Sequence, residues 1–370
     1  MTELELLQGQ DALHDILQKE LKQLDLSGLE RFFPQGNGAE LVPGAESAAD
    51  LLQRILQGEA LFQWESLSAL VKDLFLQELH SSLYLCGEIL AICIVSGLLR
   101  NLSGTFGKET ASRMGNLVCS CTVIALCLAG FREAYSLTAA SITALCSLME
   151  TLLPIAVPLL LSMGQVTTGG LLTPLTTGAV TLFAVCAEKV ILPLFLLSAV
   201  FFLGNSLMSR NTVKGLARLL RSAGIFVTGL AVTVFTGFSA LQNLAAGNAD
   251  SLLLQTAKYV TSGSVPIVGG FAADSMELVL QCAGVLKNGL GILGMVLIAG
   301  LLVMPLLKLA VLSLVYKGTA ALAEPLGEPS VTEALKEMGT SIMLLGVTLF
   351  LGALMFFLFL SILVSAGSAL

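Results

Sequence analysis

The sequence predicts an all-α fold, a polytopic bundle of about 7 to 10 transmembrane helices, on the basis of three observations. Of the 370 residues, 55% are apolar and only 12% are charged, whereas about a quarter are charged in an average soluble domain. Several uncharged runs reach about twenty residues, the length at which a helix crosses a bilayer. Charge is also uneven, because residues 1–80 hold 14 acidic and 5 basic side chains and the rest hold 12 and 14. We therefore expect a small acidic N-terminal region, 1–80, and a membrane domain, 81–370.

The N-terminal region has a helical, amphipathic pattern from Thr2 to about Gln57, with turn-forming residues at 33–38 and at Pro43-Gly44. We expect short helices outside the bilayer. Their core is thin, so they should pack against the membrane domain or a partner. Residues 1–26 contain no apolar signal-like stretch.

Seven apolar runs are candidates for spanning helices, and the last is a final span at about 340–366. One of them is expected to be two helices, which end near Met163 and begin near Leu171, because prolines and glycines interrupt it. Residues 250–277 remain open between a broken spanning helix, a re-entrant hairpin and a surface helix. The runs are Tyr84–Leu99, Met114–Phe131, Thr151–Ala187, Val190–Ser209, Ser222–Ala249, Asn288–Leu307 and Met338–Leu370.

Basic residues collect in three gaps between these runs, which predicts that the gaps are cytoplasmic. With the first span ending at Arg100, the acidic N-terminal region is then expected to be extracytoplasmic. A cytoplasmic loop explains the densest cluster better than a nucleic-acid-binding surface does. The gaps contain Arg100, Lys108 and Arg113; Arg210, Lys214, Arg218 and Arg221; and Lys317 and Lys336.

A tandem repeat of four segments is a further hypothesis, because two proline motifs recur at one offset. Pro154 and Pro266 stand 112 positions apart, and so do Pro193 and Pro305. The repeats would cover about 97–209 and 209–319 in the same orientation. The alternative is chance, since prolines match easily in leucine-rich sequence.

Motifs for enzymatic chemistry are missing from the sequence. It contains no phosphate-binding G-x-x-x-x-G-K-[ST], no H-E-x-x-H and only two histidines. The eight cysteines lie mostly in apolar segments, and Cys119 and Cys121 would point to nearly opposite sides of a helix. We therefore expect no enzyme, no cofactor and no metal site.

Ionisable residues at membrane depth are the remaining functional candidates, because they are costly there and usually mark function. Glu150, Lys308, Asp274 and Glu277 are candidates for a polar path or gate. Anchoring at the membrane interface is the favoured interpretation of Glu188, Lys189 and Lys287. Positions expected to allow close packing or to break helices are Pro154, Pro193, Pro266, Gly269, Gly270 and Pro305.

Particular strings of residues resemble the stage III sporulation protein AE family, in order and spacing, over about Leu83 to Leu370. These strings include polar as well as apolar positions, and they are ILPLFLLSAV at 191–200, TAKYV at 256–260, VPIVGG at 265–270, ADS at 273–275, Lys287-Asn288, PLLK at 305–308 and EPLG at 324–327.

The resemblance implies a non-enzymatic membrane subunit of the channel or secretion-like complex between mother cell and forespore. It would lie in the mother-cell membrane around the forespore, in membrane lipid, with other stage III A-series proteins and the forespore protein Q as partners. Family members usually begin with an apolar signal-like stretch, from which this sequence departs. The alternative function is a secondary transporter that moves a small solute or ion past Glu150 and Lys308.

Overall fold

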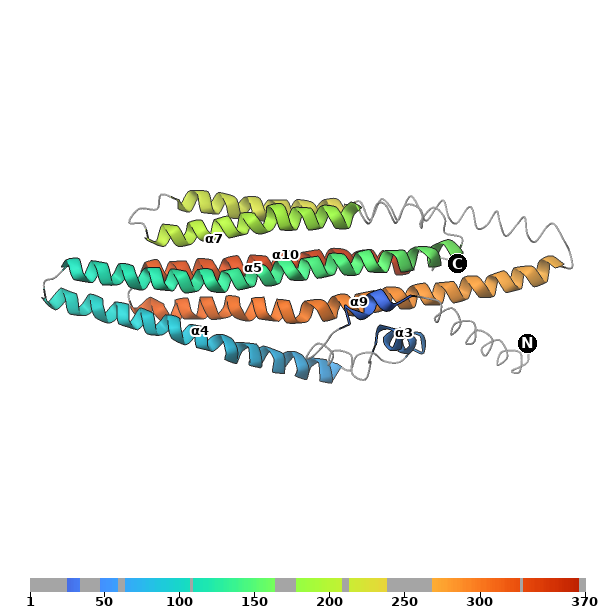
Figure 1. Cartoon of the computed structure of the whole chain (residues 1–370), viewed down its shortest axis with the longest axis horizontal. Coiled ribbons are helices and arrows are strands. Elements are labelled where there is room, and N and C mark those ends of the chain that lie inside the picture. The colour runs from blue at the N-terminus through green and yellow to red at the C-terminus, as the bar shows by residue number, and fades with distance from the viewer. Residues whose placement is uncertain are drawn as a thin grey trace.

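A computed structural model describes residues 25–33, 47–58, 64–106, 109–163, 178–207, 213–237, 268–326 and 329–365. Within these ranges the chain forms helices and no strand. Six helices are long and apolar enough to span a membrane, and they run side by side along the long axis of the molecule (Figure 1). The predicted all-α, membrane-spanning fold is therefore confirmed.

The spanning helices follow one another with short connections at one end. Two of the six are named here by the range of the candidate span, Gly178–Leu207 and Lys214–Gly237. The first of them includes the π-helix η2 (Ala187–Ile191) and α7 (Leu192–Leu207). The others are α4 (Trp64–Phe106), α5 (Glu109–Ser162), α9 (Val268–Ala323), which is followed by the short 3-10 helix η3 (Glu324–Leu326), and α10 (Pro329–Ser365).

The described residues contain six candidate spans, and the expected 7 to 10 for the whole chain remain a prediction because residues 238–267 lie outside them. Some expected runs join into one helix, since charged residues interrupt a hydropathy run without ending the helix. Arg132 and Glu133 lie inside α5, and Glu188 and Lys189 lie inside Gly178–Leu207. The 54 residues of α5 would extend about 80 Å at 1.5 Å per residue. The open segment 250–277 is described only from residue 268 onward, where it is the start of α9.

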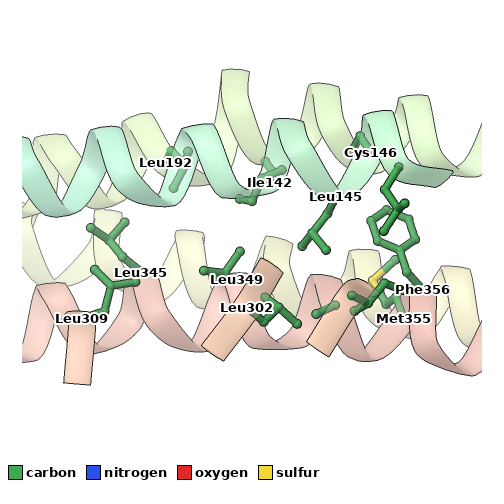
Figure 2. Packing of buried hydrophobic residues seen from close by; sticks show 14 of the residues in the cluster. Ile142, Leu145, Cys146, Leu192, Leu302, Leu309, Leu345, Leu349, Met355 and Phe356 are labelled. Atoms are coloured by element: carbon green, nitrogen blue, oxygen red, sulfur yellow. The ribbon is translucent and has the colours of Figure 1, made fainter. Parts of the chain in front are cut away.

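The core lies where α5, α9 and α10 meet. Leu145 from α5, Leu309 from α9 and Leu345 from α10 are at most 1% exposed, and Figure 2 shows side chains from all three helices directed into one layer. Deeper in the bundle, Phe356 of α10 makes edge-to-face contacts with Phe183 and Phe235, at ring-centroid distances of 5.8 and 6.4 Å. The Phe356 ring therefore joins Gly178–Leu207 and Lys214–Gly237 to the core.

The helix ends that flank the three basic gaps lie at the same end of the bundle. These ends are Phe106 and Glu109, Leu207 and Lys214, and Ala323 and Pro329, and all appear at the left of Figure 1. The gaps predicted to share one side of the membrane are thus grouped at one end of the molecule.

Two N-terminal helices, α2 (Ser27–Glu30) and α3 (Ala48–Leu56), pack on α5 and α9. Leu29, Leu51 and Leu52 are fully buried, and a Cβ added at Gly289 of α9 would meet Leu52 Cδ1 at 3.1 Å. The absence of a side chain at Gly289 lets α3 approach α9 closely. The acidic region therefore has part of its core in contact with the membrane helices, although α4 runs unbroken through the expected boundary at residue 80.

The described prolines among the positions expected to allow close packing or to break helices lie within helices. Pro154 is inside α5 and Pro305 is inside α9, which membrane helices tolerate when neighbouring groups take up the freed carbonyl. Pro193 stands two residues after η2, and the wide π turn gives its ring room against the preceding backbone. Gly269 and Gly270 lie in the first turn of α9, whereas Pro266 lies outside the described residues.

The tandem repeat remains a prediction. Helices Gly178–Leu207 and α9, which the offset would superpose, run in the same direction along the bundle (Figure 1). The segment 238–267, which contains Pro266, lies outside the described residues.

Candidate functional site

An ion pair links α9 to α5 inside the apolar part of the bundle. Lys308 Nζ lies 2.7 Å from Glu133 Oε1, with side chains 39% and 61% exposed. A charged hydrogen bond of this length is among the stronger polar contacts in proteins. Lys308 was predicted as an intramembrane candidate, and its partner Glu133 was not.

A second carboxylate, Glu78 of α4, borders the same position. Glu78 and Lys308 line a hollow of about 170 Å³ between α4 and α9. Gln77 and Ser81 add polar groups to it. One ammonium group therefore lies between two carboxylates, with room for water beside it. The hollow is lined by Leu74, Gln77, Glu78, Ser81, Met304, Leu307 and Lys308.

This group of Glu78, Glu133 and Lys308, here called the polar layer, lies within three candidate membrane spans. Each member falls inside a segment that is apolar and long enough to span a membrane. Leu309, next to Lys308, lies beside Gly346 of α10, since a Cβ built on Gly346 would be 3.6 Å from Leu309. Gly346 is nine residues from Glu337, which belongs to the charged end of α10. At 1.5 Å per residue, the layer is about 13 Å inside that end.

The other predicted gate residues are not part of the polar layer. Glu150 is exposed on α5, 17 residues beyond Glu133 and hence about 25 Å along the helix from it. Asp274 and Glu277 belong to the first turns of α9, but their side chains lie outside what the structure describes. Glu150 and Lys308 therefore do not form a single gate.

The basic cluster predicted as a loop forms the start of the helix Lys214–Gly237. Lys214 pairs with Glu333 of α10, and Arg221 NH1 lies 2.7 Å from Glu337 Oε2. Arg218 is exposed, and Arg210 lies outside the described residues. The cytoplasmic position of these residues remains a prediction, but two of them have partners on α10.

Arg221 holds three helices together. Besides its pair with Glu337, its NH2 group donates to Ser341 Oγ at 3.3 Å, and its guanidinium carbon lies 4.2 Å from the ring centroid of Phe202. Cation–π contacts of this kind add to an ion pair when water is excluded. The end of the bundle is thereby fixed by one side chain from the basic cluster.

The residues expected to anchor at the interface differ in their surroundings. Glu188 and Lys189 are exposed on η2. Lys287 is instead 1% exposed, and its Nζ donates to the carbonyl of Val364 at 3.1 Å. The side chain is buried because α10 covers it, and the interface position of Lys287 remains a prediction.

The polar groups of the N-terminal helices bond among themselves, and Glu30 of α2 accepts from the backbone N–H of Ala48 in α3 at 3.2 Å. Ser27 donates its hydroxyl and its backbone N–H to Asp25, at 2.5 and 3.1 Å, which lowers the pKa of that carboxyl. Among the described residues, no group of three His, Cys, Asp or Glu side chains is placed to hold a metal ion. The arrangement as a whole supports packing of helices and a polar position inside them.

These features define the chain as an integral membrane protein, a polytopic bundle whose charged side chains pair between helices. The family model for stage III sporulation protein AE matches residues 47–367, so the chain belongs to that family. Stage III sporulation protein AE of Bacillus subtilis (strain 168) is 28% identical over 324 residues, 87% of this chain and 81% of the relative. No solved structure gives a significant match. Family membership gives the chain a role in sporulation, in a family that is not known as enzymes.

Proposed function

We propose that the chain is a non-enzymatic membrane subunit of the channel or secretion-like complex between mother cell and forespore. Its family supports a role in stage III of sporulation, and its fold offers long helices that can pack with sister subunits. The partners would be the other stage III A-series proteins and the forespore protein Q, in the mother-cell membrane around the forespore.

Its orientation in that membrane follows from the basic helix ends. Lys214 and Arg221 are at the end of the bundle that also carries the other two basic gaps, and such residues collect on the cytoplasmic side. Helix α2 packs on α5 at Thr151 and helix α3 packs on α9 at Gly289, away from that end. They would then face the space between the two membranes and meet extracytoplasmic partners.

The observation that carries the proposal is the family match over residues 47–367. The test is affinity purification of a tagged chain from sporulating cells, followed by identification of the proteins that accompany it. The expected result is recovery of the other A-series proteins, with loss of recovery when Leu51 and Leu52, both fully buried in α3, are changed to Asp. Purification without any of these partners would contradict the proposal.

A secondary transporter is the second candidate function, and the polar layer favours it. Charged groups at membrane depth commonly mark ion or substrate pathways, and Lys308 lies between two carboxylates beside a hollow. Under this function, Lys308→Met and Glu133→Gln would abolish sporulation while complex formation continues. Under the assembly function, transport of a solute by the purified chain in vesicles is not expected.

A further inference from the structure

Two further charged side chains, Arg132 and Glu78, lie next to the Lys308–Glu133 pair. Arg132 precedes Glu133 on α5 and faces outward, and the structure gives it no ion pair with any described residue. Glu78 of α4 is partly buried beside Lys308, which bonds to Glu133. The α4–α5 face therefore presents one cation and one carboxylate that lack a close partner of their own.

Lipid is a poor cover for this face. Each of these residues lies within an apolar segment long enough to span the membrane, and an isolated charge at that depth costs about 2.5 to 3.5 kcal/mol on insertion scales, and more in simulations. Other faces of the bundle suit lipid well, because they expose side chains such as Leu182, Leu219 and Phe226, each at least 60% exposed. The charged face therefore differs from these apolar faces.

Arg132 and Glu78 also lie at the same depth. Glu133, the neighbour of Arg132, bonds to Lys308, and Glu78 lines the hollow beside Lys308. Copies of one chain in the same membrane share an orientation, so a contact between two copies side by side joins groups of equal depth. Arg132 of one copy and Glu78 of a second copy meet this condition, and their charges are opposite.

We infer that the α4–α5 face is an interface between copies of this chain, in which Arg132 of one copy pairs with Glu78 of the other. Arg132 and Glu78 border the same Lys308–Glu133 pair, so the contact is symmetric, and a two-fold axis along the membrane normal makes the Arg132–Glu78 pair twice in a dimer. It removes both charges from lipid and gives Glu78 a cation of its own. The inference concerns assembly of the chain with itself and holds for either candidate function.

The experiment measures the mass distribution of the purified full chain in detergent and in lipid nanodiscs, by native mass spectrometry. The wild type is expected to form dimers. Glu78→Arg and Arg132→Glu each place like charges together and are expected to weaken association at least about tenfold. Glu188→Arg reverses an exposed carboxylate on η2 and serves as the matched control, with no change expected. Glu78→Gln and Arg132→Gln, which add no repulsion, are expected to weaken association less.

Mixing separates a contact between copies from one within a chain. In a mixture of the Glu78→Arg and Arg132→Glu chains, a dimer of one chain of each kind again pairs opposite charges, so dimers should reappear. Recovery only when both changes are in one chain would mean an internal pair and would overturn the inference. A monomeric wild type, or single variants that assemble like wild type, would also overturn it. Each outcome is independent of which sporulation proteins accompany the chain.

Discussion

At the scale of single residues, the Arg221 contacts combine charge, hydrogen bonding and an aromatic ring. The side chains of Arg221 and Glu337 are 16% and 24% exposed, so water screens them little. Removing one partner of such a pair leaves the other charge without compensation, which costs more than the pair contributes. The surface pair Arg54–Asp50, at 3.6 Å and 33% and 41% exposed, belongs to the class that contributes about 0 to 1 kcal/mol.

Arg221→Met is therefore expected to destabilise the protein by about 3 kcal/mol, and Arg54→Met by less than about 1 kcal/mol. The double variant Arg221→Met/Glu337→Met should recover part of the loss, because no lone charge remains. Thermal unfolding in detergent, followed by the loss of monodisperse protein, measures all three. Equal losses of stability for Arg221→Met and Arg54→Met would show that the contacts of Arg221 contribute no more than those of a surface ion pair.

Two glycines on one helix provide a matched test of packing. A Cβ at Gly224 would lie 2.7 Å from Phe195 Cε1, whereas nothing lies within 4 Å of a Cβ at Gly229. Phe195 is 2% exposed and has little room to move. Gly224→Val is expected to cost about 1 to 3 kcal/mol through overpacking, and Gly229→Val much less. The same thermal assay measures both, and similar midpoints would contradict the contact between this helix and α7.

At the scale of elements, the wide turn of η2 sets which side of α7 faces the bundle. A π-helix holds one residue more than the α-helical turn it replaces. After η2, helix α7 directs Ser198, Ala199 and Phe202 into the bundle, and each of these side chains is at most 5% exposed. Ser198 Oγ donates to the carbonyl of Ala217 at 2.9 Å, so a rotation of α7 would break a contact with the next helix.

A one-residue deletion should consequently be tolerated in η2 and not in α7. In a Pro193→Ala background, deletion of Glu188 converts the wide turn to an α-helical one and leaves the face of α7 in place. Deletion of Leu197, an exposed residue of α7, rotates everything beyond it by about 100°. We expect the first variant to remain monodisperse in detergent with a small loss of melting temperature, and the second to aggregate. Aggregation of both would argue against a tolerant turn.

At the scale of the whole molecule, composition and the spacing of apolar runs were enough to predict an all-α membrane protein. The same patterns could not predict which charges pair. Lys308 and Glu133 lie on different helices and are 175 positions apart, and a single sequence carries no signal of such a contact. A local signal did exist for Glu133, since Arg132 and Glu133 interrupt an apolar stretch that continues on both sides.

Hydropathy also could not show where helices continue or what covers them. Glu188 and Lys189 appeared as a gap between spans, yet backbone hydrogen bonds carry the helix through them, with η2 as the adjustment. Lys287 lies at the edge of an apolar run, yet it is buried because α10 returns beside it and offers the carbonyl of Val364. Both outcomes depend on tertiary packing, which the order of residues along one helix does not encode.

The number of candidate spans between two residues predicts whether they lie on the same side of the membrane: an odd number places them on opposite sides. Five candidate spans separate Gln57, at the end of α3, from Lys336 of α10, so the two positions should lie on opposite sides of the membrane. Both side chains are exposed. With the chain expressed in the plasma membrane of intact vegetative cells, a membrane-impermeant maleimide is expected to label Gln57→Cys above the wild-type background and to label Lys336→Cys only after permeabilisation. The basic helix ends decide which of the two faces the cytoplasm.

Each outcome of this labelling has a distinct meaning. The reverse pattern would keep the parity and place α3 in the cytoplasm, against the charge distribution. Labelling of both positions in intact cells would require one more or one fewer crossing between them. An additional crossing would have to come from residues 238–267, because this 30-residue interval is long enough for a span of about twenty residues, whereas the 14 residues of 164–177 are too few.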